Sequence, residues 1–173
     1  GMDPRVEEHA DVIVDHSVSV EAGDEVLLAA PPAAEDLVVA LEERLAERGA
    51  RSVSINQSSR GRRAFMRAMD PEAFDDPPAS LMAMVEEIDV SIGIRASRNT
   101  HETGDVPPEK NAAYAQVMKP FQDEMMDKRW VGTQHPAPGN AQDAEMSSEA
   151  YADFVYGAVN KDWDAQRELQ EHM

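Results

Sequence analysis

The sequence lacks several features that mark whole classes of protein. It contains no cysteine, which excludes disulfide bonds and thiolate metal sites. It also has no run of about 18 apolar residues, so we expect no membrane-spanning segment. The first residues, Gly1 to Pro4, have neither a basic end nor an apolar stretch. We therefore expect no secretory signal and a cytoplasmic location.

Basic residues are scarce as well. Lys and Arg number 16 against 34 Asp and Glu, which gives a net charge of −18 over 173 residues. Phosphate binding requires a basic surface, so we expect no nucleic-acid partner. So many like charges repel one another in the compact state at low ionic strength, and salt screens that repulsion. This favours a halophilic source over an ordinary protein with one acidic face.

Four short apolar runs predict a β-sheet. They cover residues 26–30, 52–56, 89–94 and 130–133, with helix-like sequence between them. Strands that are covered on both faces read as continuous apolar runs, and parallel neighbours need crossover helices. The prediction is one three-layer α/β/α domain with a mostly parallel sheet of at least four strands. The commonest order that keeps the crossovers right-handed is 2-1-3-4.

Helical periodicity predicts the remaining elements. The expected helices cover residues 5–19, 33–48, 61–69, 79–87, 107–128 and 148–160. Gly49 is a suitable left-handed cap for the second helix, and Ser58-Ser59 can cap the third. Proline removes a backbone donor inside a helix, so Pro120 is expected to interrupt the helix that starts at Pro107 or Pro108.

Polar segments follow three of the four runs, at residues 56–59, 96–100 and 134–140. In open α/β sheets, ligands bind outside the carboxyl ends of the strands. Arg98, Asn99 and His135 fall in these segments and are our candidates for lining a cavity. The simpler interpretation is that they cap and tie loops, as Asn and Arg often do.

A group of arginines follows the second run, although the chain as a whole is acidic. Its members are Arg60, Arg62, Arg63 and Arg67, directly after Ser58 and Ser59. Ser58, Ser59, Gly61 and Arg62 could hold an anion at a helix N-terminus. Neither G-x-G-x-x-G nor the Walker pattern is present, so a nucleotide site is weakly supported. Surface arginines that pair with carboxylates are the simpler interpretation.

Metal-ligand and catalytic patterns are not found. The histidines are His9, His16, His101, His135 and His172, and their spacing matches neither HxxxH nor HExxH. There is also no Gly-x-Ser-x-Gly elbow. The residues alone therefore predict no catalytic residue and no metal in this chain.

The order and spacing of several segments are distinctive, although no single one is specific. They are residues 20–28, 33–37, 47–50, 89–99, 129–130, 135–136, 141–142, 146–147 and 154–155. Together they resemble the M29 metallo-aminopeptidases, the aminopeptidase T or thermophilic-metalloprotease group. The resemblance implies hydrolysis of N-terminal peptide bonds by two divalent ions (Zn, Co or Mg), which polarise the carbonyl and activate water.

The resemblance also implies that the metal ligands lie in a second domain, after the region that aligns here. We therefore expect residues 1–162 to be an N-terminal α/β domain and residues 163–173 a helix that leads toward a missing metal-binding domain. This truncated chain would be inactive and hold no metal. It would serve as scaffold, cavity wall and subunit contact, with peptide substrate bound through the missing domain.

Two further expectations concern partners. The chain could form a homodimer, in part through an apolar patch near Trp163. An alternative to the peptidase reading is a stand-alone, flavodoxin-like α/β module that binds an anionic metabolite or a protein partner, because a fold alone does not determine function.

Overall fold

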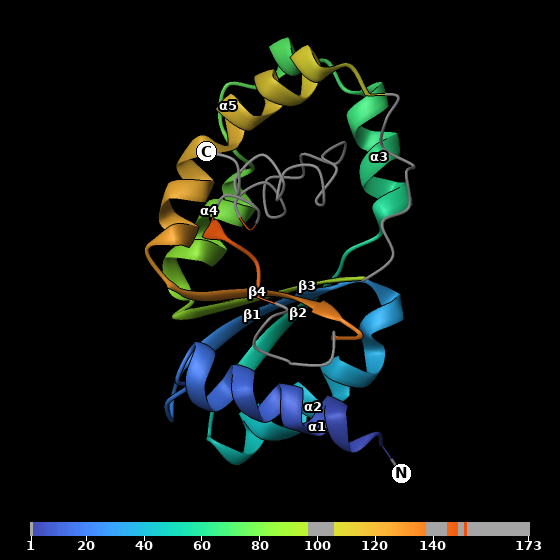
Figure 1. The fold of residues 1–173 in the computed structure, drawn as a ribbon. Helices are drawn as coiled ribbons and strands as arrows, with labels where there is room; N and C mark the ends of the chain where they lie inside the picture. The colour runs from blue at the N-terminus through green and yellow to red at the C-terminus, as the bar shows by residue number, and fades with distance from the viewer. Residues whose placement is uncertain (1, 97–105, 138–144, 149–150, 152–173) are drawn as a thin grey trace.

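A parallel sheet of four strands forms the middle layer of the structure (Figure 1). The structure is a computed structural model, and it describes residues 2–96, 106–137, 145–148 and 151. The strands are β1 (Glu25–Ala30), β2 (Arg51–Asn56), β3 (Val90–Ala96) and β4 (Arg129–His135). They lie in the order β2-β1-β3-β4, and each neighbouring pair is parallel. The predicted fold class and strand order are confirmed.

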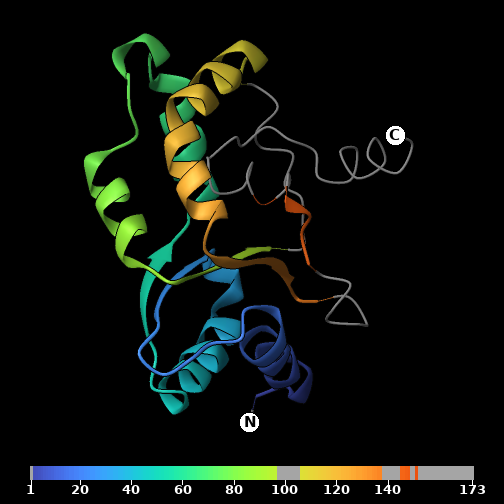
Figure 2. The ribbon, with the colours of Figure 1, turned by 90° about the vertical axis from the view of Figure 1, so that its left-hand side faces the viewer.

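One face of the sheet is covered by the amino-terminal helices (Figures 1 and 2). These are α1 (Pro4–Val12), which continues as the π-helical turn η1 (Ile13–Ser17), the short η2 (Pro32–Ala34) and α2 (Glu35–Glu47). Leu37, Leu41 and Leu45 of α2 are fully buried at helical spacing, each stabilising the fold by about 1.5–3 kcal/mol. They pack with Leu28 and Ile92 of the sheet. We call this side the α1/α2 face.

The opposite side, the α4/α5 face, carries the later helices (Figures 1 and 2). They are α3 (Ser59–Ala68), η3 (Pro71–Ala73), α4 (Ala79–Glu87) and α5 (Pro108–Met126). Val85 of α4 and Phe121 and Met125 of α5 pack against Leu27 of β1. Among the described residues, no helix has both the length and the apolar character needed to cross a membrane.

The prediction that Pro120 interrupts the helix after Pro108 is wrong, because α5 runs through it. A proline inside a helix costs about 3 kcal/mol. Met118, Phe121 and Met125 are buried on both sides of it, and each recovers about 1.5–3 kcal/mol. Tertiary burial therefore outweighs the local break. Most of the predicted helix at residues 148–160, and the one at residues 163–173, lie outside the described residues.

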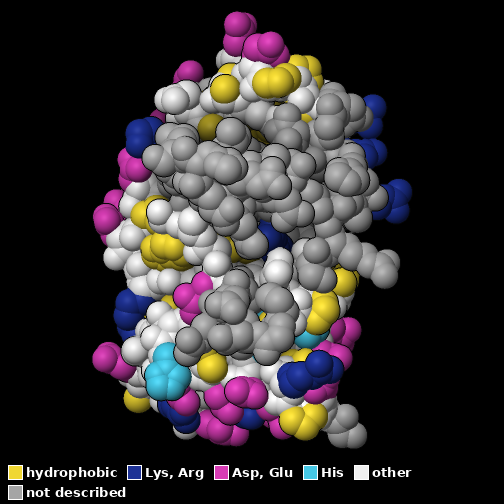
Figure 3. Space-filling model, in the orientation of Figure 1, with side chains coloured by type: hydrophobic (Ala, Val, Ile, Leu, Met, Phe, Trp, Pro, Cys, Tyr) yellow, Lys and Arg dark blue, Asp and Glu magenta, His cyan; other side chains and the backbone are white. Residues whose placement is uncertain are grey.

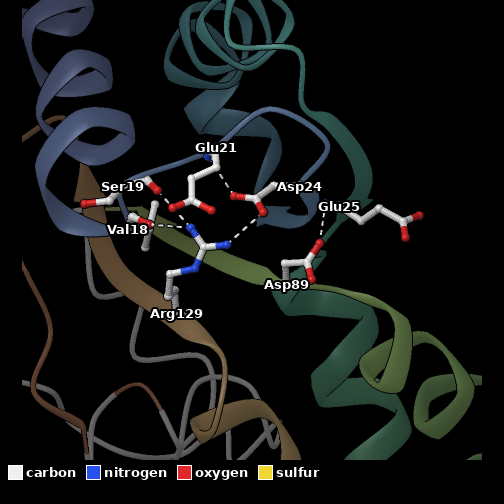
Figure 4. Close-up of polar contacts among 7 residues, drawn as sticks. All are labelled: Val18, Ser19, Glu21, Asp24, Glu25, Asp89 and Arg129. Carbon is white, nitrogen blue, oxygen red and sulfur yellow. Dashed lines mark hydrogen bonds and ion pairs between the residues drawn. The ribbon is translucent and has the colours of Figure 1, made fainter.

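The amino ends of the strands are tied together by one arginine (Figure 4). The Arg129 guanidinium donates to the carbonyl oxygens of Val18 at 3.2 Å and Ser19 at 2.8 Å, and to Asp24 Oδ1 at 2.8 Å. The other carboxylate oxygen of Asp24 accepts from the Glu21 N–H at 2.8 Å. The hydrogen bond to Asp24 raises the pKa of Arg129. This clamp fixes the start of β4 against the turn that precedes β1.

Candidate functional site at the carboxyl ends of the strands

The chain reaches opposite faces of the sheet after its two central strands. After β1 it continues into α2 on the α1/α2 face, whereas α5, the next described helix after β3, lies on the α4/α5 face. In open α/β sheets, ligands bind at such a switch point, outside the carboxyl ends of the strands. The described residues at these ends are therefore the first place to look for a site.

Polar side chains lie at the ends of three strands. Arg95 and Gln134 are in register at the ends of β3 and β4, and Arg95 Nη2 donates to Gln134 Oε1 at 3.2 Å. Gln57 follows β2 and donates its backbone N–H to the Ala30 carbonyl at 2.9 Å. The side-chain Oε1 of Gln57 is buried and accepts no hydrogen bond. The carboxyl ends of these strands thus offer a cationic group, Arg95, and a hydrogen-bond acceptor without a partner, Gln57 Oε1.

Small residues precede these polar strand ends on the α4/α5 face of the sheet. Ala29 of β1 and Gly93 of β3 are neighbours in the sheet. At Gly132 of β4, a Cβ would lie 2.7 Å from Tyr151 Cδ2 and 2.8 Å from Met146 Sδ. Tyr151 stacks on Trp130 with ring centroids 4.6 Å apart, so glycine at position 132 is what admits this aromatic ring.

Two helix residues on the same side present polar groups without partners. Asn111 of α5 is only 7% exposed, yet neither its Oδ1 nor its Nδ2 makes a hydrogen bond. Arg62 of α3 is half-buried, and burial lowers the pKa of its guanidinium, while nearby Tyr114 has the opposite effect. No described residue forms an ion pair with Arg62. Unpaired buried groups cost about 1–3 kcal/mol each, which a polar ligand would recover.

The predicted anion site is partly accounted for by helix capping. Ser58 is the N-cap of α3, and its Oγ accepts from the Gly61 N–H at 3.0 Å. The Ser58 carbonyl accepts from the Arg62 N–H at 2.9 Å. The predicted cap is confirmed, and it occupies the Gly61 donor. Ser59 is exposed. An anion bound by these four residues stays a prediction, with the Arg62 side chain as its best-supported member.

His135 lies on the other face of the sheet from Gln134, because side chains alternate along a strand. Burial lowers the pKa of His135, and Asp36 opposes this. The buried His9 of α1 lies close to His135. His9 Nε2 is 3.0 Å from Oγ1 of Thr133, which lies on the same face of β4 as His135. Burial is the main cause that lowers the pKa of His9. The charge of His135 lowers this pKa further, whereas Glu145 raises it.

The predicted cavity-lining group of Arg98, Asn99 and His135 stays a prediction. Arg98 and Asn99 lie outside the described residues, and His135 pairs with the α1/α2 layer. The involvement of His9 was not predicted. A sequence signal for it exists, since His9 shares the apolar stripe of Ala10 and Ile13, where a histidine is expected to be buried.

The described residues do not fit a metal centre. Among them, no group of three or more His, Asp and Glu side chains converges. The histidine pair does not supply one either, because His9 Nε2 is engaged by Thr133 and the Glu145 carboxylate accepts from Ser17 Oγ at 2.6 Å. The two-ion centre implied by the resemblance is not built from this part of the chain.

Comparisons with known proteins identify a family and a similar solved structure. Residues 2–173 match a family model described as thermophilic metalloprotease (M29). No curated protein matches the chain. Wild-type AmpT from Thermus thermophilus is similar in structure, with a TM-score of 0.60 and 22% sequence identity. The match covers 91% of this chain but 43% of the AmpT chain, so this chain spans less than half of that relative.

Proposed function

Because the chain belongs to the M29 family of thermophilic metalloproteases, we propose that it is the non-catalytic N-terminal domain of a metal-dependent aminopeptidase. One contrast carries the proposal: the family model matches residues 2–173, yet the described residues contain no converging set of metal ligands. The AmpT chain is more than twice as long as the matched region, which leaves room for a ligand set elsewhere. The whole protein would bind two divalent ions, Zn, Co or Mg, there.

In this proposal the domain contributes a scaffold and one wall of the peptide cavity. The polar strand ends support that role, because Gln57, Arg95 and Gln134 offer donors and acceptors that suit a peptide backbone or a carboxylate. Peptide substrate would reach the reacting ions through the rest of the protein. Nucleic acid and membrane are not expected partners, and a cytoplasmic location is part of the proposal.

The test is an aminopeptidase assay of the 173-residue chain with Co, Zn or Mg and a leucyl substrate. We expect no release of leucine above the protein-free rate, and no tightly bound metal by elemental analysis. Leucine release that is lost on chelation would place the reaction in this chain and contradict the proposal. A parent reading frame that continues past Met173 into a segment rich in Glu, His, Tyr and Asp would support it.

A second candidate, an α/β module that binds an anionic metabolite, is favoured by the unpartnered Arg62 and Asn111. Titration with phosphate and with small carboxylates, followed by NMR, separates the two. Saturable binding that Arg62→Gln weakens about tenfold, and that Arg60→Gln leaves unchanged, would support the module. Equal weak shifts in both variants would leave the peptidase domain as the better assignment.

A further inference from the structure

Helix α3 belongs to a continuous stretch of this acidic chain that carries no acidic residue. The chain has 34 Asp and Glu, but residues 48–69 contain none and hold six arginines. In Figure 3, Lys and Arg side chains gather along the edge where Figure 1 places α3, whereas Asp and Glu are frequent over the α1/α2 half. A negatively charged ligand therefore meets less repulsion at α3 than over the α1/α2 half.

Arg62 of α3 is partly buried, yet it lacks a counter-charge. Among the described residues, no carboxylate forms an ion pair with its guanidinium. Burial lowers the pKa of this group. Arginines that lose water contacts are usually paired, and this chain has more than twice as many acidic as basic residues to supply a partner. An anionic ligand would provide the missing charge.

Asn111, near the start of α5, is the second group without a partner. It is 7% exposed, and neither its Oδ1 nor its Nδ2 makes a hydrogen bond to a described residue. It belongs to the buried stripe of α5 that also holds Met118 and Met125, so its amide points inward. The preceding residue, Lys110, donates to the Arg67 carbonyl at 2.6 Å, which holds this turn of α5 against α3.

Packing between α3 and α5 brings the two groups to the sides of one residue, Tyr114. Met66 of α3 is buried with Tyr114 packed against it, and Phe65 lies edge-on to the Tyr114 ring at 5.5 Å between centroids. Arg62 is one turn before Met66 on the same side of α3. Burial raises the pKa of Tyr114, and the nearby charge of Arg62 opposes this. Asn111 is one turn before Tyr114 on α5.

The chemistry of these groups selects a ligand that carries an anion and an N–H donor side by side. Arg62 only donates, whereas the amide of Asn111 donates through Nδ2 and accepts through Oδ1. An inorganic oxyanion such as sulfate can only accept, so it would leave Asn111 Oδ1 without a partner. The last residue of a peptide has its carboxylate and its amide N–H on the same Cα atom, and it can satisfy both side chains.

We propose that Arg62 and Asn111 bind the C-terminal residue of a peptide, with its carboxylate on Arg62 and its N–H on Asn111 Oδ1. The identification of this peptide as the substrate rests on the proposed function, in which the domain forms one wall of the peptide cavity. The amino end of the peptide would extend toward the rest of the protein. The expected substrate class is therefore short peptides with a free carboxyl end.

A matched pair of ligands tests the carboxylate. N-acetyl-alanyl-alanine and its C-terminal amide differ only in that group, and NMR titration of the chain without metal should show about tenfold tighter binding of the acid. Arg62→Gln should remove this preference by weakening the acid alone. Arg60→Gln should keep it, because Arg60 is exposed on the opposite side of α3. Equal affinities for acid and amide, a preference that R62Q keeps, or no saturable binding of the acid up to about 10 mM would overturn the proposal.

Asn111→Leu tests the recognition of the N–H. It should weaken the acid and the amide alike, by about tenfold, because both ligands carry that donor. It also removes a buried amide without partners, so N111L should unfold at a higher urea concentration than the unmodified chain. Unchanged binding of both ligands by N111L, or a lower unfolding midpoint, would overturn the assignment.

Ligands without an N–H separate this site from one for a simple anion. Acetate and sulfate should bind about tenfold more weakly than N-acetyl-alanyl-alanine. If either bound as tightly, Arg62 would serve the anionic-metabolite module, and the proposal would be wrong. Because no metal is present, these affinities do not depend on hydrolysis. Leucine release by the chain would contradict the proposed function and leave the site standing, whereas equal affinities for acid and amide would remove only the site.

Discussion

At the residue scale, the contacts that hold the sheet ends together join positions far apart in the chain. Arg129 and Asp24 are separated by 105 residues, and His9 and Thr133 by 124. Periodicity reports only which side of an element is apolar, so it could place His9 inside but could not identify its partner. Alternation along β4 could have separated His135 from Gln134, since it puts His135 on the face of Thr133.

The Arg129 clamp should matter for stability because Asp24 is 8% exposed. Replacing Arg129 with Met leaves that carboxylate without its cation, and losing one partner of a buried pair costs about 3–5 kcal/mol. The Arg129 side chain is 37% exposed, so solvent reduces the expected loss to about 2 kcal/mol. Urea unfolding should show this loss for R129M and almost none for R5M, whose pair with Asp3 is exposed. Equal midpoints would contradict the clamp.

Burial of His9 predicts a dependence of stability on pH. The pKa of His9 is lowered in the folded chain, so the unfolded state binds more protons as the pH falls through about 6.5. The stability that neutral His9 provides is present above that pH and is lost below it. Urea unfolding at pH 5.5 and 7.5 should show a smaller pH-dependent loss for His9→Gln than for the unmodified chain. The same difference in both proteins would show that His9 does not contribute.

At the element scale, the strands were predictable and the course of α5 was not. The run at residues 26–30 lies within β1, which is buried on consecutive residues as a strand covered on both faces should be. The run at residues 52–56 lies within β2, but there only Val53 and Ile55 are apolar, and this edge strand is largely exposed. The polar strand ends were also foreseen in position, since Gln57 and Gln134 fall in the predicted segments. The course of α5 depends on packing against α4 and the sheet, which local sequence does not report.

Pro120 gives the element-scale prediction. It lacks the N–H that would bond to the Gln116 carbonyl, so Pro120→Ala should raise the free energy of unfolding by about 1–3 kcal/mol. Pro108→Ala is the matched control, because proline is well tolerated at the first position of a helix. Chemical denaturation of both variants measures the difference. If P120A stabilised no more than P108A, the helix would already accommodate the proline without cost.

At the scale of the whole molecule, the two ends of the sheet have different roles. The amino ends are tied by Arg129 and by the Asp89 carboxylate, which accepts from the Glu25 N–H at 2.9 Å. At the carboxyl ends, the buried Oε1 of Gln57, which follows β2, has no hydrogen-bond partner among the described residues. The printed ties thus join the amino ends of the strands, while an unsatisfied polar group is left where the proposed peptide cavity would lie.

The net charge of −18 gives the prediction for the whole molecule, and it bears on the expected halophilic source. The Debye length is about 10 Å at 0.1 M salt and about 3 Å at 1 M, so added KCl should remove most repulsion between exposed carboxylates. Calorimetry should show Tm rising by several degrees over that range. The double variant Glu86→Gln, Glu87→Gln removes two exposed charges, from −18 to −16. It should melt higher at low salt and gain less from KCl, and a flat salt response in the unmodified chain would remove the inference.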